Sequence, residues 1–320
     1  MKDMYVKDLK VDNEVLDFFS VKMIGIKKGS NGKFYLDIVL GDKTGEVSAK
    51  KWDISEEEHG NLLEIKEGDI VRIKGLVTEW NGSKQIRIGR IRKAVTSDGV
   101  DMSDFIKVAP EPAMEMYQYI WDTVDKFSDE DLKKLCKKLL TDEKERLMYY
   151  PAAQKNHHAQ MGGLLYHMKR MMMTGERICE VYRNLNKDLV LCGVVIHDIE
   201  KLNGIESDEY GVSPGYSFEG QMLGHIIQGV KTIDRLTLEM GFPREKAIML
   251  EHMILSHHYE PDFGSPKKPL FPEAEILHYL DIVDARMFDF EEALEKTEPG
   301  SFSDRIFTLD NRKIYKPEAN

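Results

Sequence analysis

A histidine and an aspartate stand side by side after an apolar segment in the middle of the chain. The segment Val194 to Lys201 reads VVIHDIEK, so His197 and Asp198 directly follow a run of aliphatic side chains. A buried imidazole beside a buried carboxylate costs free energy unless another group pairs with both. Neutral imidazole and carboxylate together suit first-row divalent ions. The segment therefore predicts a divalent metal site.

The other histidines support this prediction. The chain has ten, and nine of them lie between His157 and His278. A single histidine in a helix is usually a core residue, but independent core histidines rarely form an ordered set on separate helices. Helical bundles build metal sites from side chains on facing helices. The expected ligands are His167, His197, Asp198, His225, His257, His258 and Asp281.

Apolar side chains at helical spacing predict that the chain is helical from Ala113 onward. Ser128 to Asp131 resembles a capping box that starts one helix. Further helices are expected at 159–183, 187–199, 218–239, 243–258 and 273–295. The polar tail after Pro299 is expected to wrap the surface.

Before residue 95 the pattern changes to alternating apolar and polar side chains, which is typical of half-buried strands. The sequence GDKTG and the sequence NGS are suited to hairpin turns. A polar segment, Ser55 to Leu63, separates the third and fourth strands and has room for one helical turn. The five expected strands cover 20–29, 33–42, 45–53, 69–80 and 84–94. This order matches the OB-fold, a small Greek-key barrel that binds oligonucleotides across its second and third strands.

These patterns predict a multidomain α and β protein, in which a five-stranded OB-fold barrel precedes an all-α domain. A chain of 320 residues is long enough for two hydrophobic cores. We expect a nucleic-acid-binding barrel over 1–94 and an all-helical domain over 113–320. Residues 95–112 are the expected linker, because glycine, serine, aspartate and two prolines interrupt the periodicity there.

Charge is distributed unevenly along the chain, whose net charge is −11. Residues 1–100 carry 18 lysines and arginines against 17 acidic residues, whereas the remainder carries 27 against 39. A polyanion would therefore meet the first hundred residues more easily, and the acidic remainder would tolerate phosphate only beside bound cations. The acidic surface also leads us to expect association between copies, that is, a homo-oligomer.

The spacing of the cysteines and the length of the apolar runs indicate the cellular compartment of the protein. The three cysteines lack the spacing of a metal clip or disulfide framework, the apolar runs are shorter than a membrane span, and the first residues lack a signal-peptide apolar region. We therefore expect a cytoplasmic protein with no membrane partner.

Aromatic and basic side chains in the expected barrel suggest a partner, single-stranded nucleic acid. Base stacking is expected of Phe34, Tyr35, Trp52 and Trp80, and phosphate contact of Lys33, Lys50, Lys51, Lys84, Arg87 and Arg90. In the alternative, Trp52 and one of the two adjacent aromatics fill the barrel, and the lysines are solvated strand-edge residues. For Trp52 we favour the interior position.

Several segments of the chain resemble the HD-domain metal phosphohydrolases. The pattern that names the family is matched by His167, His197, Asp198 and Asp281, and the added ligands of its dinuclear members by His225, His257 and His258. The runs HHAQMGGLLYHM, LVLCGVVIHDIEK and MILSHHYEPDFGSPKKP, together with the preceding barrel, are similar to the YhaM-type 3′→5′ exoribonucleases. The resemblance covers nearly the whole chain in domain order.

The resemblance implies two divalent ions, with manganese as the expected metal; the ligands alone would also accept iron, cobalt, nickel or zinc. The first ion would take His167, His197, Asp198 and Asp281, and the second Asp198, His225, His257 and His258. Two adjacent ions activate water and stabilise charge on a phosphodiester. Lys201 would donate to a phosphate oxygen or to the leaving group, and its alternative is a solvated lysine at a helix end.

The implied activity is hydrolysis of single-stranded RNA, and also of DNA, from the 3′ end. Substrate contacts are expected of His157, His158, Lys267, Lys268 and Arg286. Helix-start packing is the alternative for the two histidines, and ordinary solvated charge for the three cations. His278, three residues before Asp281, is expected to hold a neighbouring ligand.

The chain departs from the family at Glu200, where HD proteins often have glycine. The carboxylate would point away, contact Lys201 or alter substrate access. Two rival functions remain open: an HD phosphohydrolase or phosphodiesterase acting on free nucleotides, and a nucleic-acid-binding protein whose HD domain is inactive.

Overall fold

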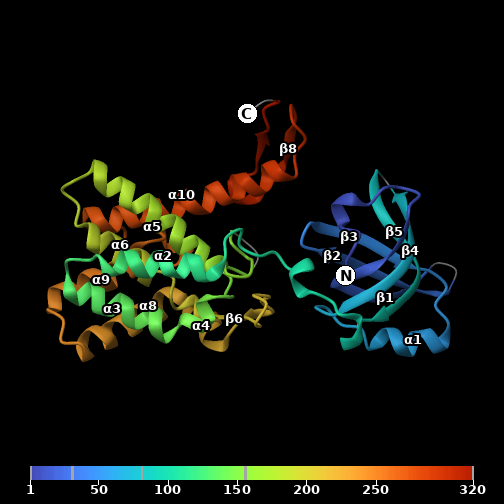
Figure 1. The fold of residues 1–320 in the computed structure, drawn as a ribbon, viewed down its shortest axis with the longest axis horizontal. Coiled ribbons are helices and arrows are strands. Elements are labelled where there is room, and N and C mark those ends of the chain that lie inside the picture. Colours follow the sequence, from blue (N-terminus) through green and yellow to red (C-terminus); the bar gives the residue numbers. More distant parts are fainter. Residues whose placement is uncertain (1, 30–31, 81, 155–156, 319–320) are drawn as a thin grey trace. The chain divides into compact units, whose positions relative to one another are not determined.

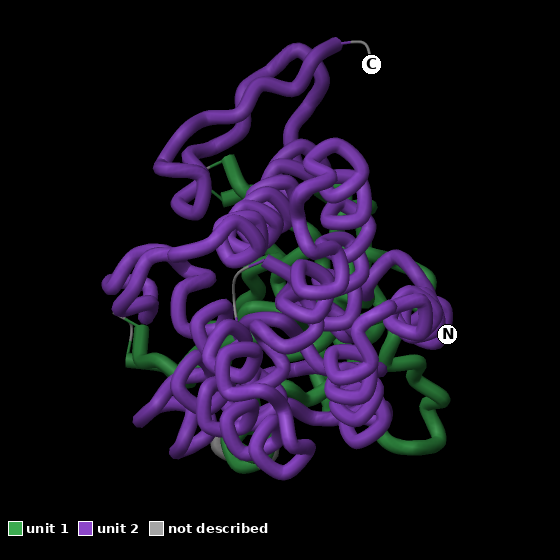
Figure 2. The backbone as a smooth tube through the Cα atoms, turned by 90° about the vertical axis from the view of Figure 1, so that its left-hand side faces the viewer, with its two compact units in different colours: residues 1–108 green, residues 109–320 purple. Residues whose placement is uncertain are grey.

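A computed structural model describes residues 2–29, 32–80, 82–154 and 157–318. The chain divides into two units, Met1–Val108 and Ala109–Asn320 (Figure 2). The division falls inside the segment 95–112 that the sequence suggests as a linker. Each unit has its own hydrophobic cluster of buried residues.

Unit 1 is a closed five-stranded barrel with the strand order β1-β2-β3-β5-β4 (Figure 1). The third and fifth strands pair in parallel and the other neighbours pair antiparallel. The strands are β1 (Glu14–Lys28), β2 (Phe34–Asp42), β3 (Gly45–Lys51), β4 (Ile70–Trp80) and β5 (Ser83–Lys93), and helix α1 (Glu56–Leu63) follows β3. This confirms the predicted OB-fold.

Alternation places one side of each strand inside the barrel. Leu36, Ile38 and Leu40 of β2 are fully buried, whereas the residues between them are only partly covered. The structure differs from the prediction at β1, which begins at Glu14, because its first half pairs with β4 and its second half with β2. Part of the expected linker also contacts the barrel, because the carbonyl oxygen of Asp104 accepts from the backbone N–H of Lys43 and its carboxylate pairs with the Lys43 side chain.

Unit 2 is built of helices around one large buried cluster. They are α2 (Ala113–Asp125), α3 (Glu130–Asp142), α4 (Lys144–Leu147), α5 (Gly163–Val181), α6 (Lys187–Ile196), α7 (Lys201–Gly204), α8 (Phe218–Glu239), α9 (Arg244–Ser256) and α10 (Pro272–Glu295). The helical prediction is confirmed in outline, and none of the described helices combines the length and apolar character needed to cross a membrane.

Two small sheets were not predicted. Strand β6 (Ile205–Glu206) pairs with β7 (Gly215–Tyr216), and β8 (Phe302–Ile306) pairs with β9 (Arg312–Tyr315). The expectation of a polar tail wrapped on the surface is wrong, because this tail forms the β8–β9 hairpin. Leu309 and Ile314 of the tail form a separate small cluster with Ala293 of α10.

The start of α8 lies against the end of α7 at a contact that only glycine permits. A Cβ on Gly220 would lie 1.9 Å from the carbonyl oxygen of Gly204. Ser217 fixes this approach, because its backbone N–H donates to the Gly204 oxygen and its Oγ accepts from the Gly220 N–H. The contact sets where α8 begins. It therefore also affects the position of His225, which follows on the same helix.

We predict that Gly220→Ala lowers the free energy of unfolding by about 1–3 kcal/mol, because the added methyl group meets backbone that must move. The matched control is Gly215→Ala, where a Cβ has no atom within 4 Å; its change should stay within about 0.5 kcal/mol. Thermal and denaturant unfolding of the full chain measures both. Equal stability of the two variants would contradict the close contact.

Candidate metal centre

One ring nitrogen of His167 is held by a hydrogen bond, and the other has no hydrogen-bond partner. It lies on α5, is fully buried, and its Nδ1 is 2.7 Å from Oδ2 of Asp284. Its Nε2 faces Oδ1 of Asp281 at 3.4 Å and Oδ2 of Asp198 at 3.8 Å. The contact with Asp284 fixes the ring, so Nε2 points toward two further carboxylates.

His197 and Asp198 follow the last residue of α6. The His197 Nδ1–H donates to the carbonyl oxygen of Val194 at 2.9 Å, which leaves Nε2 at 3.4 Å from Oδ2 of Asp198. Asp198 is 2% exposed, and the Nζ of Lys201 lies 2.6 Å from the same oxygen. The alternative for Lys201, a solvated lysine at a helix end, therefore does not describe it, and its role toward the phosphate stays a prediction.

The second carboxylate oxygen of Asp198 faces a different pair of histidines. His225 Nε2 lies 3.2 Å from Oδ1, and His257 Nε2 lies 3.9 Å from it. The His257 Nδ1–H donates to the Ile254 carbonyl oxygen, and the Nδ1–H of the adjacent His258 donates to the Phe263 carbonyl oxygen. One ring nitrogen from each of His225, His257 and His258 lies within 4.8 Å of the other two.

His225 reaches this position because α8 is kinked immediately before it. Gly224 has φ 69° and ψ 161°, which is not helical. Residues with a side chain almost never adopt this combination, so the kink depends on glycine.

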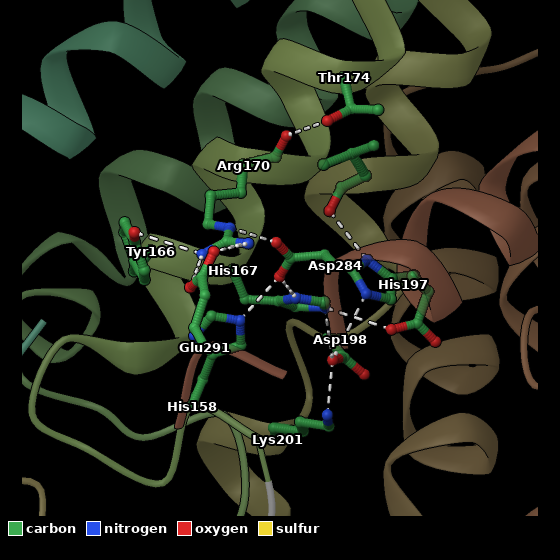
Figure 3. A network of polar contacts seen from close by, with 12 residues as sticks. His158, Tyr166, His167, Arg170, Thr174, His197, Asp198, Lys201, Asp284 and Glu291 are labelled. Atoms are coloured by element: carbon green, nitrogen blue, oxygen red, sulfur yellow. Dashed lines mark hydrogen bonds and ion pairs between the residues drawn. The ribbon is translucent and has the colours of Figure 1, made fainter. Parts of the chain in front are cut away.

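The facing atoms lack hydrogen-bond partners although they are buried. In the described part of the chain, the unpartnered buried atoms around Asp198 are its own Oδ1 and the Nε2 atoms of His167, His197, His225 and His257. Such groups are costly to bury unpaired. A cation that accepts their lone pairs removes the cost, and imidazole with carboxylate is a suitable donor set for a divalent ion. Figure 3 shows His167 and His197 turned toward Asp198.

Protonation also favours metal binding at this cluster. Burial lowers the pKa of His225 to about 3, and it lowers the pKa of His257 as well. Burial would raise the pKa of Asp198, but the charges of Lys201 and His197 outweigh it and hold that pKa well below the usual range. Neutral imidazole and ionised carboxylate are the forms that bind metal.

His167 responds differently from the other rings. Burial alone would lower its pKa, but the nearby carboxylates of Asp281 and Asp284 outweigh burial and raise the pKa to about 9. In the absence of an ion, the surrounding carboxylates thus stabilise a positive charge on this ring. The pocket favours cations.

Asp284 is a member of this site that the sequence analysis missed. Its Oδ2 contacts both His167 Nδ1 and His158 Nε2 at 2.7 Å, and its Oδ1 lies 2.5 Å from Nε of Arg170. Arg170 in turn donates to Glu291 (Figure 3). The available signal was its spacing, because a residue three after Asp281 lies on the same face of α10.

The predicted substrate-contacting histidines lie in two different environments. His158 is fully buried in the Asp284 network, which favours the packing alternative over the expected direct substrate contact. His157 is partly exposed, and its ring centroid lies 6.1 Å from that of His167.

The predicted phosphate-binding cations of unit 2 lie in the loop before α10 and on α10 itself. Lys267 and Lys268 are exposed in the loop before α10, and Lys268 is 3.4 Å from Glu260. Arg286 forms an ion pair with Asp310 in the tail hairpin. The substrate role of these three residues stays a prediction.

The two residues noted beside the ligands also have defined contacts. The Nδ1–H of His278 donates to the His257 carbonyl oxygen at 2.7 Å, so it contacts the backbone of an expected ligand. The buried carboxylate of Glu200 accepts from Asn203 Nδ2 at 2.7 Å.

In unit 1, the aromatic side chains suggested for stacking are on the surface. Trp80 is 68% exposed, Phe34 44% and Trp52 50%, so the expectation that Trp52 fills the barrel is wrong. Aliphatic residues fill that space instead. Tyr35 stacks on Trp52, with ring centroids 4.7 Å apart.

Comparison with known proteins agrees with both units. Residues 164–286 match the HD domain family, and residues 20–94 match the OB-fold nucleic acid binding domain family. Over 29% of this chain, a solved OB-fold domain of replication protein A from Methanococcus maripaludis aligns at 19% identity with a TM-score of 0.23, covering 94% of that chain.

Two curated relatives are each described as 3′-5′ exoribonuclease YhaM. The protein from Geobacillus sp. is 37% identical over 308 residues, which is 96% of this chain and 93% of that protein. The protein from Halalkalibacterium halodurans is 36% identical over the same length, 96% of this chain and 94% of its own. Identity of this extent across both units shows that the chain belongs to the YhaM 3′-5′ exoribonuclease family of HD-domain proteins.

Proposed function

We propose that this protein is a metal-dependent 3′→5′ exoribonuclease that hydrolyses single-stranded RNA, and DNA as well, to nucleoside monophosphates. The observation that carries the proposal is the gathering of unpartnered ligand atoms at the two oxygens of Asp198. The printed activity of the two relatives supports the reaction and its direction.

The ligands divide according to the Asp198 oxygen that they face. Two ions would be held by two sets of residues, and Asp198 belongs to both sets. The first set is His167, His197, Asp198 and Asp281, and the second is Asp198, His225, His257 and His258. Bound divalent ions supply an activated water and neutralise charge on the phosphate. We propose manganese as the metal.

Lys201 is the cation of the chain that best serves the reacting phosphate. Its side chain is 12% exposed, and its Nζ lies 2.6 Å from Asp198 Oδ2. A protonated amine here donates to a phosphoryl oxygen or to the departing 3′ oxygen, because it needs only to rotate away from Asp198. His157, whose ring centroid lies 6.1 Å from that of His167, would contact the last nucleotide.

Asp284 acts by positioning. A carboxylate that binds the second nitrogen of a metal-ligating histidine fixes the orientation of the ring and raises its basicity. Asp284 does this for His167, and Arg170 fixes Asp284 from its other oxygen. The barrel of unit 1 binds the strand through exposed Phe34 and Trp80.

The first prediction concerns turnover. With manganese, the wild-type protein should shorten 5′-labelled single-stranded RNA from its 3′ end and release nucleoside monophosphates, and a chelator should stop the reaction. Asp198→Ala should reduce turnover to the level without enzyme, because it removes the ligand shared by both sets. Gel electrophoresis and product chromatography measure this.

The control is Asp142→Ala, which removes an exposed carboxylate that pairs with Lys138 at the end of α3. It should retain wild-type turnover. Wild-type turnover by Asp198→Ala would contradict the mechanism. Hydrolysis of mononucleotides or cyclic dinucleotides with intact RNA would favour a free-nucleotide phosphohydrolase, and RNA binding without turnover under any divalent ion would favour a binding protein.

The second prediction concerns Asp284. Asp284→Asn should weaken manganese binding by about 10- to 100-fold, because the neutral amide holds His167 less firmly. Calorimetric titration of the metal-free protein with manganese measures the affinity independently of activity. Thermal unfolding of the metal-free variant reports whether the fold is intact.

Glu291→Gln is the matched control for this network. It changes the outer carboxylate, which contacts Arg170 and is 54% exposed. Its manganese affinity should stay within about 3-fold of wild type, since exposed ion pairs contribute little. If Asp284→Asn also binds manganese like wild type, the positioning role is wrong.

The remaining expectations concern the whole protein. A cytoplasmic location and association between copies stay predictions of the sequence. Cell fractionation tests the first, and the mass of the protein in solution tests the second.

A further inference from the structure

Unit 1 has a groove on the side of the barrel where β4 and β5 lie next to the end of β3. Its volume is about 620 Å³, and its lining comes from the start of β1, from Trp52 directly after β3, and from the middle of β4 and β5. The pairing of β4 with β5 shifts here, because Lys74 pairs with Arg90 and the next residue, Gly75, pairs with Ile88, which leaves Gly89 of β5 as the extra residue of a bulge. We call it the bulge groove. Its volume falls in the range of small-ligand pockets.

Three cations line the bulge groove and have no ion-pair partner among the described residues. They are Lys74, Arg87 and Arg90, and all three are exposed. Lys74 and Arg90 are register partners across β4 and β5, so their side chains share one face. Glu14 is the single carboxylate in the lining. The groove therefore has an excess of positive charge.

The neighbouring cations on the same strand are different. Arg92 binds Asp98 with both ends of its guanidinium at 2.7 Å, and Lys93 lies 2.8 Å from Asp69. Arg87 and Arg90, which line the groove, have no such ion pair among the described residues, and neither does Lys84 at the start of β5. Three like charges repel one another, and an anion between them would relieve this repulsion.

An aromatic ring is available beside these cations. Trp52 lines the groove and is 50% exposed, and it stacks on Tyr35 of β2. A ring with half its surface in solvent can stack a nucleobase, and stacking is independent of base identity. A base on Trp52 with its phosphate at Arg87 uses both features of the groove.

The bulge groove continues from the surface where OB-folds bind oligonucleotides. Lys50 of β3 lies over the rings of both Tyr35 and Trp52, at 5.3 and 5.6 Å from their centroids. Lys50 is also the register partner of Arg87 across β3 and β5. Trp52 therefore stands at the border between the β2–β3 surface and the groove.

We propose that the bulge groove is an additional nucleotide subsite, which takes one base and its phosphates from a single-stranded polynucleotide that passes over Trp52. The base stacks on Trp52, the phosphates contact Lys74, Arg87 and Arg90, and Glu14 accepts from base amino groups. The subsite deepens the proposed function and rests on it, because it lengthens the stretch of RNA that unit 1 holds.

The test is RNA binding by the metal-free full chain in the presence of a chelator, so that no turnover occurs. The probe is a labelled single-stranded RNA of about 12 nucleotides, a length within the range bound by OB-folds, and fluorescence anisotropy gives the Kd. Trp52→Ala should raise the Kd by about 5- to 150-fold, the effect of losing one stacked base. A DNA of the same sequence forms a second arm and should respond in the same direction.

A double variant tests the charges separately from the stacking. Arg87→Gln with Arg90→Gln should raise the Kd and reduce the slope of log affinity against log salt by about 1.4, which corresponds to two lost phosphate contacts. The matched control changes two paired cations of the same strand, Arg92→Gln with Lys93→Gln. Its salt slope should equal that of wild type. Thermal unfolding reports whether each variant is folded.

The outcomes separate the subsite from the proposed function. Wild-type Kd and salt slope in the folded groove variants would overturn the subsite, as would an equal loss in the Arg92 and Lys93 control. Weakened RNA binding in the groove variants supports it even if the wild-type protein fails to hydrolyse RNA with manganese. That failure would overturn the proposed function alone.

Discussion

The buried carboxylate of Asp198 is the constraint on which unit 2 depends. Four imidazole nitrogens face its two oxygens, and hydrogen bonds do not satisfy them. Lys201 balances part of the charge, at one oxygen only. Five helices must meet correctly for this cluster to form, so the binding energy of the ions adds to folding. Metal binding and the packing of α5, α6, α8, α9 and α10 are therefore coupled.

Two of the ligand histidines, His197 and His257, are oriented by the same kind of local hydrogen bond. His197 and His257 each follow the last residue of a helix, α6 and α9, and each uses Nδ1 to donate to the carbonyl oxygen three residues earlier. Carbonyls at a helix end lack partners within the helix. In each case one hydrogen bond gives a carbonyl oxygen at the helix end a partner and points Nε2 inward. Both ligand rings are therefore held by the backbone.

Residue type and periodicity were sufficient to predict the barrel, the helices and the residues now found around Asp198. They were not sufficient for features that depend on packing between distant segments. Asp284 matters because His158 and Arg170 come to it, and no local pattern shows this. Trp52 resembled a core residue by type, yet aliphatic side chains already fill the barrel. The tail hairpin likewise depends on contact with the end of α10.

The proposed function requires both units to bind a polyanion, although the net charge of the chain is −11. Net charge does not solve it, because even residues 1–100 carry nearly equal numbers of each sign. Unit 1 solves it by pairing: Arg92 and Lys93 are neutralised by carboxylates, whereas Arg87 and Arg90 are left without partners beside an exposed tryptophan. Unit 2 solves it by recruiting ions to buried carboxylates. In each case the local arrangement of partners, and not the number of charges, decides where phosphate can bind.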